Sequence, residues 1–374
     1  MKIDSIELRK IIDSRTRETV EAEVNGVSGK APSGASTGSH EAKAFVPDGL
    51  ENMEDLLKEM EGQDLTQEEF DAKLRKIDGT DDFSRLGSVA IAASLAFKNA
   101  SGFNHSNSFP LPLSNVIGGG EHGGNTSIQE FLVLPVEAET FSEAVKINTE
   151  IYQDLQERYS RKIMGINDEG ALITSMDDEQ TLKALKKVAD EHGARIGLDI
   201  AATEFYENGR YKMSSINQRL EPKEHLAFVQ HLIDEFDLVY VEDPFHEDDF
   251  NRHAKLASQN PEVMICGDDV FVTQKERLQE GIDNRACNSL IVKPNQVGTV
   301  SDTRETVELA KENGYTPVIS HRSGETCDHT ISDLSLELEC PVIKAGIADI
   351  RIAKLNRLIK LWDKQKSPVV NNRL

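Results

Sequence analysis

Long apolar segments are missing from this chain of 374 residues. No run reaches the roughly 18 apolar residues that a membrane-spanning helix needs, so we expect no membrane span. The N-terminus, MKIDSIELRK, lacks the apolar core of a signal peptide. The four cysteines are scattered and include no CxxC pair. We therefore expect neither a disulfide framework nor a zinc site, and we predict a cytoplasmic protein.

Positive charge is also scarce. The chain has 42 Lys and Arg against 65 Asp and Glu, a net charge of −23. Such a surface repels nucleic acid and anionic membranes, so we expect no nucleic-acid partner. The acidic excess has two interpretations that can both hold: a solubilising surface, or carboxylates clustered to bind divalent cations. Only the positions of the carboxylates separate the two.

The first part of the chain predicts a small α+β domain over residues 1–111. The segment TVEAEVNGVSGKAPSG contains a hairpin signal, Asn25-Gly26. Two helices should follow: DLTQEEFDAKLRKID, with Thr66 and Glu69 at capping-box spacing, and the buried, alanine-rich RLGSVAIAASLAFKNASG. The prolines of NSFPLPLSN interrupt regular structure and mark the predicted boundary.

Residues 112–374 have a different pattern. Short apolar runs end in polar residues, and helical stretches such as DEQTLKALKKVADEHG lie between several of them. This alternation predicts a parallel sheet, and at least seven strands over about 260 residues fit an α/β TIM-type barrel. The runs are QEFLVLP, ARIGLDIAA, FDLVYVEDPF, VMICGDD, SLIVKPNQVG, TPVISHRSG and CPVIKAG.

In such a barrel the chemistry lies at the C-terminal ends of the strands. The polar residues near these run ends should therefore meet at one mouth, although the strand before Asp168 and Glu169 is poorly marked. The residues are Glu130, Asp168, Glu169, Asp199, Glu242, Asp243, Asp268, Asp269, Lys293, His321, Arg322, Ser323 and Lys344.

Asp199, Glu242 and Asp268 end three successive strands. Carboxylates crowded at one mouth repel one another unless a cation joins them. Oxygen ligands suit a hard ion, and Mg²⁺ is the expected one. Each acid alone is better explained as a helix cap or a solvated loop residue. Their positions on three consecutive strands favour the metal site.

Lys293 and Lys344 end two further strands. A lysine near a dication and other cations can lose its proton close to neutral pH, so Lys293 is a candidate general base. Lys344 is a candidate for the same role or for a fixed charge facing a substrate carboxylate. A structural ion pair with the acids is the alternative for each. A metal beside a lysine base suits removal of a proton from carbon next to a carboxylate.

Nine short motifs along the chain make the interpretation more specific. They are DSR (13–15), PSGASTG (32–38), IQEF (128–131), DEG (168–170), GLD (197–199), EDPF (242–245), GDD (267–269), KPNQVGT (293–299) and SHRSGET (320–326). In this order they resemble the enolase (phosphopyruvate hydratase) family over most of the chain, which looks like a shortened member. Superfamily sites combine a lysine or histidine base with one or two Mg²⁺ ions.

The resemblance implies a modified barrel and the reversible, Mg²⁺-dependent conversion of 2-phosphoglycerate to phosphoenolpyruvate in glycolysis and gluconeogenesis. It implies two Mg²⁺ per active site. Asp199, Glu242 and Asp268 would hold the first ion, and Ser36 would help to bind the second.

The resemblance also implies roles toward the substrate. Lys293 would take the C2 proton, and Glu169, with Glu130 nearby, would help the C3 hydroxyl leave as water. The remaining residues would contact the substrate. Lys344 would bind its carboxylate, and Arg322, Ser323 and His122 would bind its phosphate. His321 would line the pocket.

Several positions depart from the family pattern. DSRTRET replaces DSRGNPT, the loop from His122 to Glu130 is about one residue short, and AGIADIRIAKLN after Lys344 lacks the RSER run. The last difference falls near the family's subunit contact. We expect a homodimer or higher homo-oligomer, but the sequence leaves its contact open, and it leaves open whether the shortened loops preserve full activity.

Two other functions stay open at this point. A superfamily paralogue acting on another carboxylate, such as a sugar-acid dehydratase, would not need the phosphate contacts, yet Arg322, Ser323 and Ser36 are present. A non-enzymatic binding protein would be free to lose Lys293, Glu169 or a metal ligand, and none is lost. The loop GGGEHGG is not a P-loop, because no GK[ST] follows it.

Overall fold

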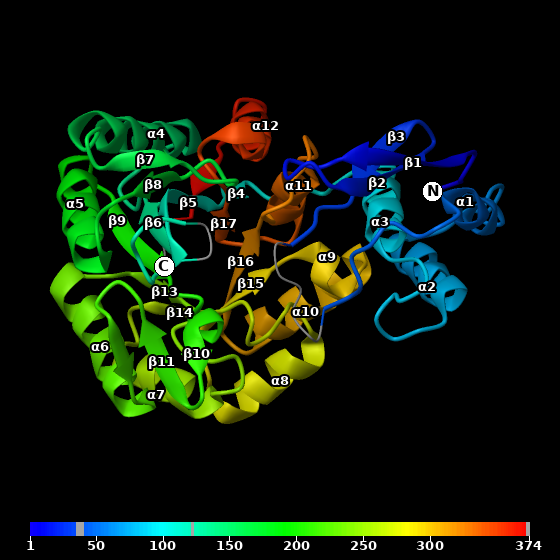
Figure 1. Ribbon diagram of the computed structural model, residues 1–374. Helices are drawn as coiled ribbons and strands as arrows, with labels where there is room; N and C mark the ends of the chain where they lie inside the picture. The colour runs from blue at the N-terminus through cyan, green and yellow to red at the C-terminus, as the bar shows by residue number, and fades with distance from the viewer. Residues whose placement is uncertain (35–40, 121–122, 372–374) are drawn as a thin grey trace.

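The computed structural model describes residues 1–34, 41–120 and 123–371 (Figure 1). An N-terminal α+β unit lies beside a larger barrel. The unit contains an antiparallel sheet in the order β1-β2-β3 and three helices. Its elements are β1 (Ile6–Ile12), β2 (Glu18–Val24), β3 (Val27–Lys30), α1 (Leu50–Lys58), α2 (Gln67–Asp78) and α3 (Ser88–Ser101).

The local signals of the N-terminal sequence are confirmed. Asn25 and Gly26 join β2 to β3 with φ of 51° and 77°, as a two-residue hairpin turn with positive φ at both positions requires. Thr66 and Glu69 form the capping box of α2. The sheet packs closely on α3, because a Cβ added to Gly29 would lie 2.2 Å from the backbone nitrogen of Ala96.

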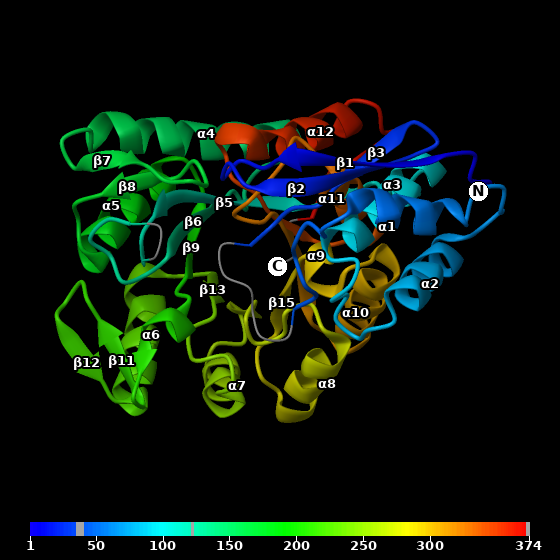
Figure 2. The same cartoon turned by 45° about the vertical axis from the view of Figure 1, so that its right-hand side comes forward.

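The N-terminal unit is fixed to the barrel through α2 and α3, both of which contact α10 (Val300–Glu312). Figure 2 shows α2 next to α10. Asp71 of α2 is buried at this junction. Its carboxylate accepts from the backbone N–H and the hydroxyl of Ser301, at 2.9 and 2.6 Å, and from the hydroxyl of Ser94 at 2.7 Å. A buried carboxylate with this many donors fixes the relative placement of the two units.

The barrel closes because β17 pairs with both β16 and β5. Around the ring the order is β5-β6-β9-β13-β14-β15-β16-β17. All seven predicted apolar runs are strands of this ring, which confirms the TIM-type barrel. The strands are β5 (Leu111–Gly118), β6 (Glu130–Leu134), β9 (Arg195–Asp199), β13 (Tyr240–Glu242), β14 (Met264–Gly267), β15 (Ser289–Val292), β16 (Thr316–Ser320) and β17 (Val342–Lys344).

Helices surround the ring (Figure 1). Besides α10, they are α4 (Phe141–Arg158), α5 (Asp178–Glu191), α6 (Pro222–Phe236), α7 (Phe250–Gln259), α8 (Lys275–Asn284), α9 (Pro294–Val297), α11 (Thr330–Glu337) and α12 (Ile352–Trp362). The smaller elements are β4 (Ser108–Phe109), β7 (Ile163–Ile166), β8 (Leu172–Thr174), η2 (Ala202–Phe205), β10 (Tyr206–Glu207), β11 (Arg210–Met213), β12 (Gln218–Leu220), η3 (Asp349–Arg351) and β18 (Val369–Val370).

Two features of the barrel differ from the sequence prediction. Strand β6 runs antiparallel to both β5 and β9, so the ring is not wholly parallel. The connection from β5 to β6 covers only residues 119–129, which is shorter than the crossover that a parallel pair needs, so the strand direction reverses. Strand β5 was missed because the prolines of NSFPLPLSN were interpreted only as a boundary, although Pro112 lies inside β5.

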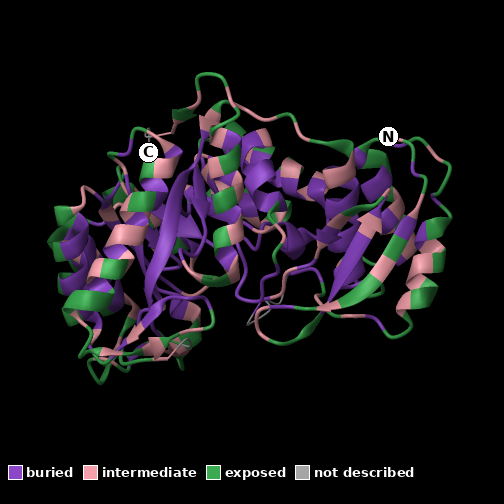
Figure 3. Ribbon diagram, turned by 90° about the horizontal axis from the view of Figure 1, so that it is seen from above, coloured by how far each residue is buried: buried purple, intermediate pink, exposed green. Residues whose placement is uncertain are grey.

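Two apolar layers make up the core. The larger lies between the barrel strands and the surrounding helices and extends under the N-terminal sheet. The smaller fills the inside of the ring with alternate side chains of its strands, as in other TIM barrels. Figure 3 shows the strands of the ring as buried. The smaller cluster contains Leu111, Leu113, Leu132, Leu134, Tyr240, Met264, Cys266, Ile291, Val318 and Val342. Among the described residues, none of the helices has the length and apolar character to span a bilayer.

Two buried histidines make the stability of this fold depend on pH. Burial lowers the pKa of both His225 and His253 to about 4, from a usual value of 6.5. Above pH 6.5 both are neutral in the folded and unfolded chains. As the pH falls toward 4, only the unfolded chain takes up the protons. We expect the free energy of unfolding to fall by about 3 kcal/mol per histidine over this range, measured by urea unfolding. The variant His253→Phe should lose about half of this dependence, and an unchanged dependence would contradict the assignment.

Candidate active site

A cavity of about 530 Å³ lies at the barrel mouth. Its walls come from the strand ends that the sequence singled out and from the N-terminal unit. The described residues that line it are Arg15, Gly34, Glu41, Gln129, Glu130, Asp168, Glu169, Asp199, Ala201, Glu204, Asp243, Asp268, Asp269, Lys293, Gln296, Ser320, His321, Arg322, Ser323 and Lys344.

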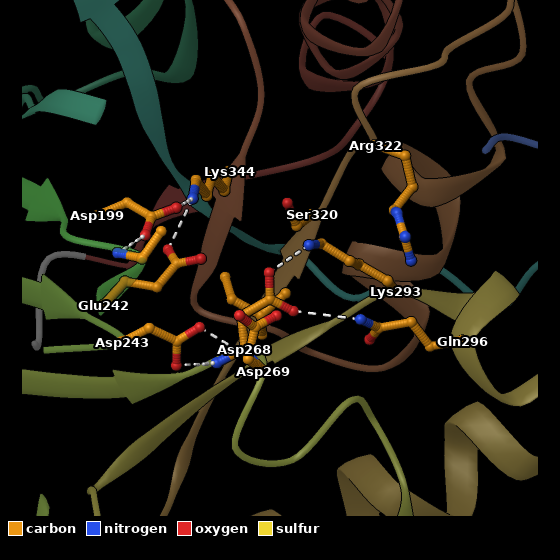
Figure 4. A network of polar contacts seen from close by, with 12 residues as sticks. Asp199, Glu242, Asp243, Asp268, Asp269, Lys293, Gln296, Ser320, Arg322 and Lys344 are labelled. Carbon is orange, nitrogen blue, oxygen red and sulfur yellow. Dashed lines mark hydrogen bonds and ion pairs between the residues drawn. The ribbon is translucent and has the colours of Figure 1, made fainter. Parts of the chain in front are cut away.

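Strand register explains why the acids meet. Asp199 is paired with Glu242 across β9 and β13, and Glu130 with Asp199 across β6 and β9. Because β6 is antiparallel, Glu130 reaches the mouth from the beginning of its strand. Lys344 lies among these acids: its Nζ is 2.9 Å from Glu130 Oε2, 2.9 Å from Asp199 Oδ2 and 2.7 Å from Glu242 Oε2. Figure 4 shows Asp199, Glu242 and Lys344 on one side of the site, with Lys293, Gln296 and Arg322 on the other.

Burial and mutual interaction shift the pKa values of the charged residues in this group. Burial, and then Asp199, raise the pKa of Glu242 well above its usual value. Burial raises the pKa of Glu130 to about 7, against the pull of Lys344. For Lys344 itself, burial would lower the pKa, but Asp199, Glu130 and Glu242 outweigh burial and raise it far above its usual value. One ammonium thus neutralises part of a cluster that carries more negative than positive charge.

Glu242 retains capacity for a cation. Its Oε2 accepts from the hydroxyl of Tyr240 at 2.5 Å and contacts Lys344, whereas its Oε1 is buried without a hydrogen-bond partner. A buried carboxylate oxygen without a donor is costly. Together with Asp199 and Asp268 it offers oxygen atoms only, which fits a hard dication such as Mg²⁺. The donor set therefore fits the predicted metal.

Lys293 and Asp268 form an ion pair within the cavity. Burial would raise the pKa of Asp268, but Lys293 outweighs burial and lowers it. In the same way burial would lower the pKa of Lys293, but Asp268 raises it. Without a cation on Asp268, the ion pair therefore keeps Lys293 protonated. This is the structural ion pair that was considered from the sequence as the alternative to a general base. Gln296 Nε2 adds a hydrogen bond to Asp268 Oδ1 at 3.2 Å.

A second acidic group includes Asp243, Asp268 and Asp269, whose carboxylate oxygens lie within 4.8 Å of one another. Both oxygens of Asp243 already accept backbone N–H groups, from Asp268 at 2.9 Å and from Asp269 at 2.8 Å. Asp243 is thus an anchor for the loop after β14 and not a free ligand. Burial, and then Asp268, raise the pKa of Asp269 to about 8, so an added cation here would be favoured electrostatically.

Glu169 lies on the tight turn between β7 and β8, not on a strand of the ring. Asn167 Oδ1 shapes this turn by accepting the N–H groups of Glu169 and Ala171, at 3.0 and 2.8 Å. His321 faces the turn, with Nε2 3.8 Å from Glu169 Oε2. Its Nδ1 accepts from Gly346 N–H at 3.1 Å, and burial lowers the pKa of His321 well below its usual value. A neutral His321 therefore carries its proton on Nε2, toward Glu169.

The N-terminal unit reaches the other end of the cavity. Arg322 is paired with Glu41 at 2.9 Å, and Arg15 Nη1 donates to Ser323 Oγ at 3.3 Å. Ser33 and Gly324 exchange two backbone hydrogen bonds of 2.8 Å each. A side chain at Gly324 would collide with Ser33, because an added Cβ would lie 2.2 Å from its hydroxyl oxygen. The segment SHRSG is thus held against the N-terminal unit.

Buried cations also support this segment from behind. Arg351, which is fully buried, donates to the carbonyl oxygens of Arg322 and Ser323. Lys354 is paired with Glu325, whose Oε1 accepts the N–H of Arg322 at 3.0 Å. Both cations come from the sequence that lacks the RSER run, so this shortened region still supplies two buried cations behind the segment.

The described residues predicted for the site come together in one cavity: Glu130, Glu169, Asp199, Asp268, Lys293, His321, Arg322, Ser323 and Lys344 line it, and Glu242 contacts Lys344 behind its wall. Ser36 and His122 lie outside the described residues. Sequence reasoning missed roles for Arg15, Glu41 and Gln296. Two of them had a usable signal: Arg15 belongs to the DSR motif and Gln296 to KPNQVGT.

Comparison with known proteins agrees with this geometry. Fold and site define a TIM-barrel enzyme with an acidic, lysine-containing cavity. The family model "Enolase, N-terminal domain" matches residues 3–111, and "Enolase, C-terminal TIM barrel domain" matches residues 106–370. Proteins named enolase are similar to this chain over nearly its whole length. The enolase of Archaeoglobus fulgidus is 42% identical, and the match covers 98% of this chain and 99% of that protein. The enolase of Natronomonas pharaonis is 44% identical, and the match covers 96% of this chain and 98% of that protein.

The chain belongs to the enolase family. It is accordingly an enzyme of the carbon–oxygen lyase class with enolase function, as the resemblance implied. The sugar-acid dehydratase and the non-enzymatic binding protein are not favoured.

Proposed function

We propose that this enzyme converts 2-phosphoglycerate to phosphoenolpyruvate and water, reversibly and with two Mg²⁺ ions per active site. The observation that carries the proposal is the joint placement of Lys293, Glu169, Asp199 and Asp268 around one cavity, with Glu242 paired with Asp199 behind its wall. Removal of a proton next to a carboxylate needs a base and positive charge that stabilises the extra negative charge on that carboxylate. Departure of the hydroxyl as water then needs a proton donor.

The side chains of this chain divide the work as follows. Lys293 in its neutral form takes the proton from C2. Glu169, oriented by its turn and facing His321, gives a proton to the C3 hydroxyl, so that the C3–O bond breaks and water leaves. Lys344 faces the substrate carboxylate, and Glu130 sets the charge beside it. Arg322 and Ser323 bind the phosphate, and a guanidinium suits that task because it can donate two parallel hydrogen bonds.

Asp199, Glu242 and Asp268 would hold the first Mg²⁺, which fits the partnerless Oε1 of Glu242. When bound, the ions stabilise the negative charge that develops on the substrate carboxylate. We expect Lys293 to lose its proton only when Asp268 is engaged by a cation, since that carboxylate raises the pKa of Lys293. Ser36 and His122 remain proposals from the resemblance, for the second ion and the phosphate.

The test is a direct assay of the purified protein with 2-phosphoglycerate, following the ultraviolet absorbance of the enol product. We expect absorbance to rise with Mg²⁺, to stay flat with a chelator and to rise again when Mg²⁺ is restored. A flat trace from folded, Mg²⁺-loaded protein would overturn the proposal. A screen of other 2-hydroxy acids and sugar acids would then be the appropriate next experiment.

We propose a cytoplasmic enzyme with domains 1–111 and 112–374, a division supported by the start of β5 at Leu111. We also propose a homo-oligomer. The exposed side chains of Met164 and Ile166 on β7 support a contact surface, since they are 67% and 55% exposed.

A further inference from the structure

The pair of Glu41 and Arg322 joins the N-terminal unit to the barrel mouth. Glu41 Oε2 accepts from Arg322 Nη1 at 2.9 Å, and Glu41 Oε1 accepts from Nη2 at 3.4 Å. The two side chains are only 4% and 5% exposed. Two hydrogen bonds from one guanidinium to one carboxylate restrict the plane of the guanidinium, so Glu41 sets the orientation of the Arg322 side chain.

Glu41 is also held by Gln296, which contacts the proposed metal ligand Asp268 as well. Gln296 Nε2 donates to Glu41 Oε1 at 3.3 Å and to Asp268 Oδ1 at 3.2 Å. The amide of Gln296 is oriented by Thr273, whose hydroxyl donates to Gln296 Oε1 at 2.6 Å. The backbone adds a hydrogen bond of 2.8 Å, from the N–H of Ala42 to the carbonyl oxygen of Gln296. One amide therefore connects the partner of Arg322 with a proposed ligand of Mg²⁺.

Arg322 is attracted by the metal carboxylates as well. Burial would lower the pKa of Arg322, but Glu41, Asp268 and Asp269 together raise it. If Glu41 were absent, the buried cation would have Asp268 and Asp269 as the acids that still attract it. A buried cation that loses an ion-pair partner is drawn more strongly toward the other negative charges near it, and there it would compete with a metal ion for the same oxygens.

We infer that Glu41 is a positioning residue that holds Arg322 for the phosphate and keeps this cation away from the carboxylates that bind Mg²⁺. The inference rests on the proposed function, which assigns phosphate to Arg322 and the metal to Asp268. Loss of Glu41 should therefore weaken the binding of two different ligands, the substrate and the metal ion.

The experiment compares Glu41→Ala and Glu41→Gln with the wild type. Glu41→Ala should raise KM for 2-phosphoglycerate by about tenfold or more, with a smaller fall in kcat, because a buried charge loses its partner. Calorimetric titration with Mg²⁺ alone, without substrate, should show a several-fold weaker affinity. Glu41→Gln keeps the shape and one acceptor oxygen, so it should recover part of both affinities.

Asp333→Asn is the matched control, because Asp333 is another buried carboxylate paired with an arginine, Arg357, but lies outside the cavity. It should lower thermal stability and leave KM and Mg²⁺ affinity unchanged. Unchanged KM and Mg²⁺ affinity in folded Glu41→Ala and Glu41→Gln would overturn the inference, and so would a lower KM, which would make Glu41 a competitor of the phosphate. If the wild type did not turn over 2-phosphoglycerate, the proposed function would fail, while the Mg²⁺ titrations would still report on Glu41.

Discussion

Replacing Lys293 with alanine should nearly abolish exchange of the C2 proton of 2-phosphoglycerate with solvent. A positioned general base contributes a factor of about 10² to 10⁴, so exchange should slow by that amount. Mg²⁺ affinity should stay equal or increase, because the variant removes the ammonium that is paired with Asp268. Proton magnetic resonance in heavy water measures the exchange, and calorimetry measures the metal.

Glu169→Gln is the matched variant for this experiment, because it changes the proposed proton donor and leaves the proposed base intact. It should block dehydration while the C2 proton still exchanges. Loss of both activities in Glu169→Gln would refute this division of labour. Exchange that persists in Lys293→Ala would assign the base to another group.

Replacing Lys344 with methionine should destabilise the metal-free protein by about 3–5 kcal/mol, as expected when one member of a buried charge cluster is removed. Glu130, Asp199 and Glu242 would then lie together without their ammonium. Adding Mg²⁺ should restore part of the lost stability, because the ion replaces the missing positive charge. Denaturant unfolding with chelator and with Mg²⁺ measures both effects.

Lys360→Met is the control for this substitution, since Lys360 is exposed on α12. It should change the free energy of unfolding by less than about 0.5 kcal/mol. If Lys344→Met were as stable as this control in the presence of chelator, the prediction would be wrong. Lys344 would then not be needed to offset the negative charge of the three acids.

Much of the site could be predicted from the sequence because its residues follow buried strands. Asp199, Glu242, Asp268, Lys293 and Lys344 each follow an apolar run, and a barrel brings such positions to one mouth. The reversal of β6 could not be predicted in this way. A short apolar run carries no sign of its direction, and only the length and content of its connection determine it.

The residues from the N-terminal unit could not be placed from sequence patterns either. Arg15 and Glu41 enter the cavity because the N-terminal unit is fixed to the barrel, by α2 and α3 on α10 and by the pairing of Ser33 with Gly324. Nothing in their local sequence encodes that docking. Arg351 and Lys354 are similar: on a helix they would be expected at the surface, yet both are buried behind the segment that carries Arg322.

The reversal of β6 has a consequence for how this enzyme can change over evolutionary time. In an ordinary β/α repeat, the connection that follows a helix lies at the far end of the barrel, and its length affects mainly folding. Here both ends of the connection from β5 to β6 lie at the substrate end, because β5 finishes there and β6 begins there with Glu130. Insertions or deletions in this connection can therefore reshape the entrance without altering the closure of the ring, which makes it the natural position for libraries aimed at new substrates.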